Sequence, residues 1–197
     1  SDSVQAVRDA HATWQHNIQQ HQTALDAQAT RTQKIQTLET QIEELEDVIQ
    51  TDYREIEQEF DRLSHHEHIM QDCGSSLNVL DESEQNITQE LASIIRRLES
   101  HAGRSEQLSA IYNSLLNAQS EIEDATANLR QFMDRQSFDP ERMEQLNTTL
   151  EVFHRMARKY RIQPEQLKAT YETWQIELQQ LHQLENPESL AEQVEIS

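Results

Sequence analysis

The chain is short of the residues that make turns. Its 197 residues include two glycines and three prolines, whereas average usage is about 7% Gly and 5% Pro. Sandwiches, barrels and propellers need a turn roughly every 8–12 residues, so the sequence excludes these many-stranded folds. Gln, Glu, Leu and Ala are abundant, and 35% of the residues are hydrophobic. This composition is typical of long helices and coiled coils, and it predicts an all-α fold.

Apolar residues recur at the alternating steps of three and four that form a coiled-coil seam. The most regular stretch is 104–136, whose seam positions are Leu108, Ile111, Leu115, Ala118, Ile122, Ala125, Leu129 and Phe132. Residues 140–160 show the same spacing. The first 47 residues follow it too, with a register slip at Ile35 and Leu38. Their earlier seam positions are Val4, Val7, His11, Trp14, Ile18, His21, Leu25, Gln28 and Thr32.

Proline and glycine indicate where these helices begin and end. Three Pro-Glu pairs mark helix starts, at Asp139-Pro140-Glu141, Gln163-Pro164-Glu165 and Asn186-Pro187-Glu188. Gly74 and the polar run 81–86 are expected to interrupt the helical pattern, and a short helix is expected to end before Gly103. We therefore expect about six helices and a C-terminal stub.

The first helix and the helix around residues 167–181 are expected to pair antiparallel, which would bring both chain ends to one end of a rod. The predicted fold is an elongated antiparallel coiled coil with a helical bundle distal to the chain termini. Residues 1–49 form the outgoing coiled-coil helix, residues 50–136 the distal bundle, and residues 137–197 the returning helices. Such a rod is expected to project, as an insertion, from a body that supplies the chain on either side.

The charge of the chain restricts its partners. Acidic residues outnumber basic ones by 36 to 16, and the net charge of −20 repels nucleic acid from most of the surface. The two glycines, Gly74 and Gly103, lie about 29 positions apart, so the chain has no Gly-rich phosphate-binding loop of the GxxxxGK[ST] or GxGxxG type. The single cysteine, Cys73, excludes a disulfide framework and favours a reducing compartment. The sequence shows neither a secretory leader nor an apolar stretch of bilayer length, so we expect a cytoplasmic chain without membrane contact.

Two histidine motifs are interpreted as structural. In the run 65–68, neighbouring side chains point about 100° apart on a helix, so at most two share a face, and one cysteine completes no common zinc set. Glu151 and His154 have the Glu-x-x-His spacing of di-iron bundles, but the second copy that such sites require is missing from the sequence. We therefore expect no catalytic, metal or cofactor-binding residue here, and a structural or interaction element in place of an enzyme.

One segment reverses the charge of the chain. Between residues 151 and 161 the sole acid is Glu151, and the local net charge is +3. The four basic residues are Arg155, Arg158, Lys159 and Arg161, and they are the candidate functional residues. The helix dipole favours cations at a helix C-terminus, so a purely structural role is one interpretation. Contact with an anion or an acidic partner and contact with nucleic acid are the alternatives.

Several runs of the sequence match a known pattern. They are Phe138-Asp139-Pro140-Glu141-Arg142-Met143-Glu144, His154-Arg155-Met156-Ala157-Arg158-Lys159-Tyr160 and Pro164-Glu165-Gln166-Leu167, with further likeness at 42–45, 53–64 and 125–134. In these runs the chain resembles the RecN family of bacterial DNA repair proteins over nearly its whole length. The family often has glycine after the Arg-Lys-Tyr run, where this chain has Arg161.

The resemblance implies the central coiled-coil region of an SMC-like protein. RecN proteins have an ABC-type ATPase head, split across the two ends of the sequence, that binds ATP and Mg and lies outside this chain. They act in repair and recombination at DNA double-strand breaks. The implied parent protein is a cytoplasmic, nucleoid-associated homodimer that contacts DNA mainly through its other parts, and the arm is implied to be a lever, a spacer and an oligomer or partner contact. The alternative is a spectrin-like cytoplasmic scaffold or adaptor, which requires a fixed-period repeat that the sequence lacks.

Overall fold

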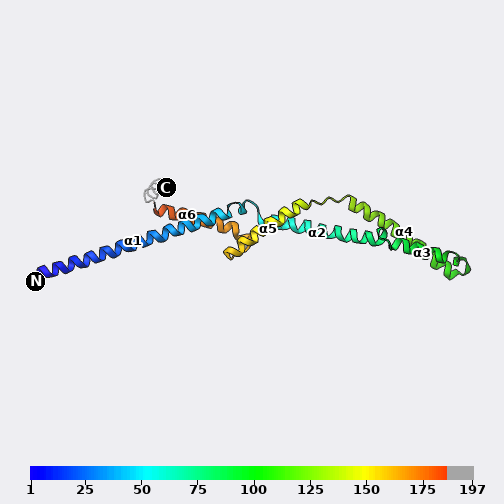
Figure 1. Ribbon diagram of the computed structural model, residues 1–197, viewed down its shortest axis with the longest axis horizontal. Helices are drawn as coiled ribbons and strands as arrows, with labels where there is room; N and C mark the ends of the chain where they lie inside the picture. Colours follow the sequence, from blue (N-terminus) through cyan, green and yellow to red (C-terminus); the bar gives the residue numbers. More distant parts are fainter. Residues whose placement is uncertain (186–197) are drawn as a thin grey trace. The chain divides into compact units, whose positions relative to one another are not determined.

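The computed structural model describes residues 1–185, and every regular element among them is helical (Figure 1). The α-helices are α1 (Asp2–Glu46), α2 (Tyr53–Leu77), α3 (Ile87–Glu99), α4 (Glu106–Asp134), α5 (Pro140–Tyr160) and α6 (Leu167–Glu185). Short 3-10 helices are η1 (Val48–Gln50), η3 (Ala102–Arg104) and η4 (Pro164–Gln166), and η2 (Asn78–Glu82) is a π-helix. The predicted all-α class is confirmed.

The contacts divide the chain into two compact units. The first unit contains residues 1–56 and the described residues from 149 onward, and the second contains residues 57–148. The boundaries fall inside α2 and α5, so each of these helices contributes to both units. The division into 1–49, 50–136 and 137–197 stays a prediction.

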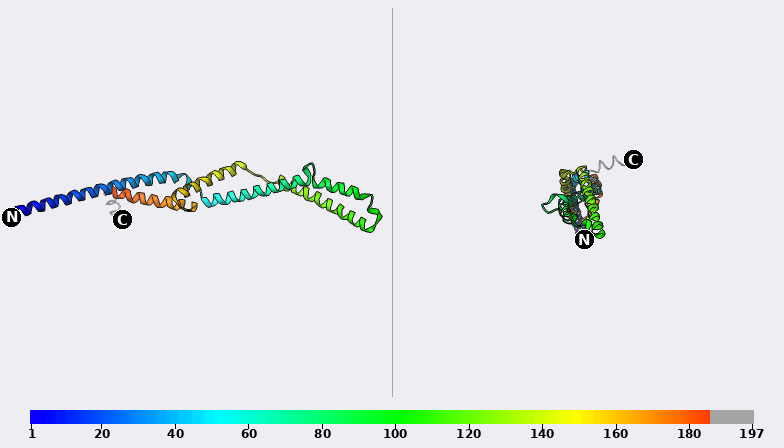
Figure 2. Two further views of the ribbon diagram at one scale, coloured as in Figure 1. Left: turned by 60° about the horizontal axis from the view of Figure 1, so that its bottom comes forward. Right: turned by 90° about the vertical axis from the view of Figure 1, so that its right-hand side faces the viewer.

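In the first unit, α1 and α6 lie side by side and run antiparallel, as the sequence predicts (Figure 1, Figure 2). An ion pair joins them, because Lys34 Nζ lies 2.8 Å from a carboxylate oxygen of Glu177. Leu45 and Leu167 are fully shielded from solvent. The other buried hydrophobic side chains of this unit are Ile35, Leu38, Tyr53, Leu150, Phe153, Met156, Ala157 and Tyr171. Full burial of one leucine contributes about 1.5–3 kcal/mol, so these contacts stabilise the pairing.

The seam of α1 is buried only in its C-terminal part. Ile35, Leu38 and Leu45 are buried, so the register slip at Ile35 and Leu38 does not interrupt the core. Residues 1–30 are all exposed. The large hydrophobic side chains exposed in this part are Val4, Val7, Trp14, Ile18 and Leu25. The N-terminal part of α1 therefore offers an apolar stripe that no described residue covers.

In the second unit, α3 packs against α4, and a corner precedes α3. Asn86 is buried, with 2% of its surface exposed, and it caps α3 because its Oδ1 accepts a hydrogen bond from the Gln89 amide. Its side-chain nitrogen donates hydrogen bonds to the carbonyls of Asp81 and Ser83. Thr88 Oγ1 donates to the Leu80 carbonyl. These bonds satisfy the backbone where the chain leaves the π-helix η2, and they explain why a polar asparagine is buried here.

The inward face of α4 differs in part from the predicted seam. Leu115, Ile122 and Leu129 are half-buried, as the spacing predicts, but the other predicted seam residues are exposed: Leu108, Ile111, Ala118, Ala125 and Phe132. The remaining inward-facing positions of α4 come one residue later than predicted, at Tyr112, Gln119, Thr126 and Met133. Thr126 is tolerated inside because its Oγ1 donates to the Ile122 carbonyl at 2.7 Å.

Gly74 does not interrupt α2, so that prediction is wrong. The helix runs through it to Leu77, and the nearest side-chain atom to a Cβ placed at Gly74 would be Met133 Cε at 3.7 Å. Glycine disfavours a helix by about 1 kcal/mol relative to alanine, which tertiary packing of the rest of α2 overrides. The predicted break at 81–86 is confirmed.

Two of the predicted helix starts are confirmed. Asp139 Oδ1 accepts a hydrogen bond from the Arg142 amide, and α5 begins at Pro140. Gln163 and Gln166 form a capping box around Pro164 at the start of η4. The third start, Asn186-Pro187-Glu188, lies outside the described residues.

Candidate functional site

The four candidate basic residues lie at the C-terminal end of α5, where the helix stops at a left-handed residue. Arg161 has φ 57°. The Ile162 amide donates to the Ala157 carbonyl at 3.1 Å, and the Arg161 amide donates to the Arg158 carbonyl at 3.3 Å. This pair of bonds is the Schellman motif, which usually has glycine at the left-handed position. The structure therefore keeps the helix stop that the RecN-like pattern has at this position, with arginine in place of glycine.

Lys159 and Tyr160 point toward α1. Lys159 Nζ lies 2.7 Å from both carboxylate oxygens of Glu44, and the Tyr160 hydroxyl donates to the same carboxylate. The bonds from Lys159 and Tyr160 hold the pKa of Glu44 below its usual value, while burial and the bond to Glu44 raise the pKa of Tyr160. The Tyr160 ring also packs edge to face on Trp174 of α6, with ring centroids 4.9 Å apart. Lys159 and Tyr160 thus fasten α5 to α1 and α6.

The three arginines of the segment remain exposed. Neither Arg158 nor Arg161 forms an ion pair with any residue of the described chain, and Arg155 acts on Glu44 only at longer range. The structure separates the predicted set into one cation with a structural partner, Lys159, and three that are open to solvent. Sequence spacing gave no signal for this separation, because Glu44 lies 115 residues from Lys159.

The histidine motifs do not assemble a metal site within residues 1–185. No group of three or more His, Cys, Asp or Glu side chains in that part of the chain is placed to hold a metal ion. His66 Nε2 is buried in the second unit without a hydrogen-bond partner. In the first unit, the ring of His154 lies edge-on to Tyr53, with centroids 5.8 Å apart.

A cleft in the first unit was not predicted. It lies where the turn between α1 and α2 meets the turn between α5 and α6, and it encloses about 240 Å³. Its lining residues are Ile49, Thr51, Asp52, Tyr53, Arg54, Phe153, Pro164, Glu165 and Lys168. These residues come from three separate parts of the sequence and share no periodicity, so spacing arguments do not group them.

The described helices contain none with the combined length and apolar character needed to cross a bilayer.

The chain is similar to known DNA repair proteins. Over its whole length the chain is 28% identical to the DNA repair protein RecN of Vibrio cholerae, and the matched region makes up 36% of that protein. Over 95% of its length the chain is 26% identical to the RecN of Haemophilus influenzae, and it matches 34% of that protein. Over 80% of its length it is 23% identical to the RecN of Deinococcus radiodurans, and it matches 28% of that protein. No family model matches the chain. The chain spans about a third of the length of these relatives, and its resemblance to RecN is confirmed.

Proposed function

We propose that this chain is the coiled-coil arm of a RecN-like double-strand-break repair and recombination protein. The observation that carries the proposal is the antiparallel return of α6 along α1, in a chain that spans about a third of its relatives. An arm of this kind joins parts of a longer protein. The ATPase heads, with their ATP and Mg, lie in those other parts, as do the main DNA contacts. The parent protein is a cytoplasmic, nucleoid-associated homodimer.

The exposed apolar stripe on α1 supports the proposal that the arm pairs with another helix of the longer protein. An isolated helix is marginal in water, and most helical stability comes from packing of an apolar face. Residues 1–30 have that face but no described partner. In the longer protein we expect another helix to cover Val4, Val7, Trp14, Ile18 and Leu25, which have coiled-coil spacing.

The arm acts as a lever and spacer. At about 1.5 Å per residue, the 45 residues of α1 make a helix long enough to magnify a small tilt at one end. ATP-driven movement of a head would tilt such a helix, and the displacement would grow with distance along it. The arm also provides surface for a second protomer or another repair protein.

Proline at Leu115 tests the lever. Leu115 lies on the inward face of α4, and proline inside a helix removes a hydrogen bond and costs about 3 kcal/mol or more. In the intact protein, L115P is expected to leave ATP hydrolysis in place and to abolish survival after double-strand breaks. The matched control is S137P, in the loop between α4 and α5, which is expected to keep both activities. Full repair in cells that carry L115P would contradict the lever.

The exposed arginines Arg155, Arg158 and Arg161 contact an acidic protein surface or another anion. Their side chains are solvated, so the attraction is electrostatic and falls with salt. Binding of the chain to duplex DNA is expected to be weak, since about three cations act against a net charge of −20. Measuring DNA affinity at 50 and 200 mM salt, with the triple Arg→Gln variant as control, separates the two partners. Tight DNA binding that is lost in the variant would favour nucleic acid.

A further inference from the structure

The N-terminal part of α1 has an apolar face that no described residue covers. Its large hydrophobic side chains are 45–69% exposed, and they are Val4, Val7, Trp14, Ile18 and Leu25. Figure 2 shows this part of α1 extending past the described end of α6. A helix is stabilised mainly by packing of its apolar face. The stripe therefore requires an occupant, which the proposed function describes only as another helix.

The stripe has the spacing of one helix of a coiled coil. Its seam positions alternate steps of three and four from residue 4 to residue 28, which is about three and a half heptads. Seams of this length are typical of coiled coils. The seam also contains His11, His21 and Gln28. Polar residues at seam positions weaken most pairings, so they favour the register that places them opposite one another.

One antiparallel register of two copies matches the polar positions. In this register a two-fold axis passes beside residue 16, so that both copies contribute the same surface. The opposed seam residues are Trp14 with Ile18, Val7 with Leu25, His11 with His21 and Val4 with Gln28. A shift of one heptad in either direction shortens the seam and places a histidine against Trp14 or Ile18.

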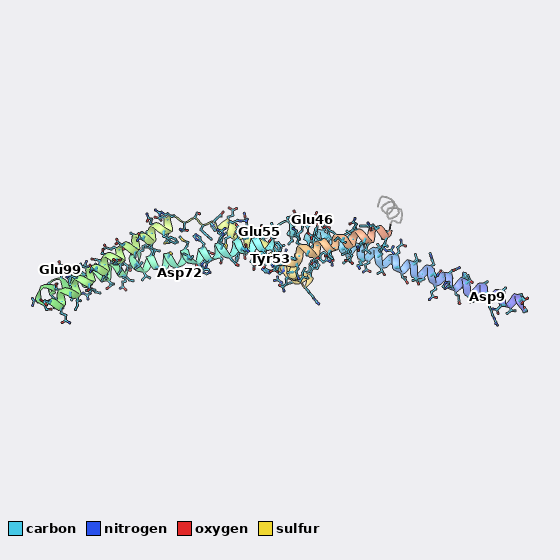
Figure 3. All side chains as sticks on the ribbon, turned by 180° about the vertical axis from the view of Figure 1, so that it is seen from behind. Asp9, Glu46, Tyr53, Glu55, Asp72 and Glu99 are labelled. Carbon is cyan, nitrogen blue, oxygen red and sulfur yellow. The ribbon has the colours of Figure 1, made fainter. Side chains whose placement is uncertain are left out.

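The charges of this segment allow a second copy to approach, although the whole chain is acidic. Residues 10–25 contain no acidic or basic residue. The acids among residues 1–30 are Asp2, Asp9 and Asp26, and all three occupy outer positions of the heptad, away from the seam and its flanks. Figure 3 shows Asp9 on the free part of α1. Antiparallel pairing therefore brings no like charges together across the seam.

The remaining acids decide the direction of pairing. Of the 36 acidic residues, 33 follow residue 30. A parallel pair would place these residues side by side. In an antiparallel pair they leave the paired segment at opposite ends, about 36 Å apart at 1.5 Å per residue. This separation is several times the Debye length of about 8 Å at physiological ionic strength, so the net charge opposes a parallel pair far more than an antiparallel one.

We propose that two copies of this chain pair through residues 4–28 of α1 as an antiparallel coiled coil, with Trp14 of each copy packed on Ile18 of the other. This pairing rests on the proposed function, because it identifies the helix that covers the stripe as α1 of the second protomer. The C-terminal part of α1 takes no part, since α6 of the same copy already packs on it.

The first test is sedimentation equilibrium of the 197-residue chain between about 1 and 200 µM. The average mass is expected to rise with concentration toward that of two chains. I18E places a charge at the centre of the seam, on a side chain that is exposed in one copy, and is expected to raise the dissociation constant of the dimer at least about tenfold. The matched control I176E makes the same change at an exposed position of α6 and is expected to change it less than about twofold.

Disulfide cross-linking tests the direction and the register. Chains that carry V7C are mixed with chains that carry L25C, both in a C73S background, in a glutathione redox buffer. The expected product is a disulfide between V7C of one chain and L25C of the other, while V7C chains alone stay unlinked. The matched control mixes V7C with I18C, which this register keeps one heptad apart, and is expected to give no product.

Each other outcome overturns the proposal. A monomer at every concentration, or equal effects of I18E and I176E, would remove the second copy from the stripe. V7C linked to itself would show a parallel pair, and V7C linked to I18C would show a different register. A monomer whose urea midpoint falls with I18E but not with I176E would identify residues 186–197 of the same chain as the occupant. The arm itself is tested separately by L115P, so failure of the pairing is distinguishable from failure of the proposed function.

Discussion

Replacing Arg161 with glycine tests the backbone geometry that ends α5. Arg161 has φ 57°, and a left-handed conformation costs an L-residue roughly 1–2 kcal/mol. Glycine has no such cost, but it adds about 0.4–1 kcal/mol of conformational entropy to the unfolded chain. The difference predicts that R161G stabilises the first unit by about 0.5–1 kcal/mol, with both Schellman hydrogen bonds retained.

Two further variants separate the backbone from the side chain. R161A removes the same charge while keeping the left-handed strain, so it is expected to leave stability nearly unchanged. R155G places glycine inside α5, where arginine is exposed and helical, and is expected to destabilise by about 1 kcal/mol. The three variants together distinguish relief of strain from a general effect of glycine or of charge.

The assay is urea unfolding followed by tryptophan fluorescence. Both tryptophans, Trp14 and Trp174, belong to the first unit, so the signal reports that unit and not the second. A midpoint for R161G above that of R161A is the expected result, at an unchanged denaturant dependence. A midpoint at or below that of R161A would show that the left-handed position carries no cost and would refute the reasoning.

Three other predictions follow from the structure. L45A and L167A each empty a fully buried site and are expected to destabilise the first unit by about 2–5 kcal/mol, whereas I176A, at a side chain 58% exposed, is expected to cost less than about 0.5 kcal/mol in the same urea assay. Because Lys159 and Tyr160 lower the folded pKa of Glu44 below 4.5, stability from these contacts is complete above about pH 4.5 and is lost as pH falls through the folded value. Fluorescence-monitored unfolding at pH 6 and pH 3 should therefore show a smaller acid loss for E44Q than for the unchanged chain, and an equal loss would contradict this. G74A is expected to stabilise α2 by about 1 kcal/mol, since its methyl group would meet Met133 at an ordinary contact distance, and slower amide hydrogen exchange in α2 measures it.

Local chemistry made much of the fold predictable. The shortage of glycine and proline, the seam spacing and the Asp139-Pro140 start all act over a few residues, so they can be read without tertiary information. The antiparallel pairing of α1 with α6 also follows, because both helices carry an apolar face that needs a partner. The same reasoning gave the wrong result at Gly74, because the neighbouring turns of α2 hold the helix together despite one unfavourable residue.

The details that depend on a partner surface were not predictable. The spacing of α4 offers Ile111 and Phe132 as seam residues, but the helix turns Tyr112 and Met133 inward instead. Likewise, Lys159 differs from the other three candidate basic residues only because the packing of α5 on α1 brings Glu44 beside it. The cleft depends on two turns that meet in space, and neither turn has a sequence signal for the space between them.

We expect a partner that selects one position on this chain to contact the C-terminal end of α5. Acidic residues outnumber basic ones by 36 to 16, and the field of this excess attracts cations without selecting a position. The end of α5 reverses this charge, because Arg155, Arg158 and Arg161 are exposed there, beside a helix stop of defined backbone geometry. Discrimination requires charges in fixed relation. A partner that binds by selection is therefore expected to lose affinity with R158E/R161E far more than with R8E/R104E, and equal losses would show that it senses total charge alone.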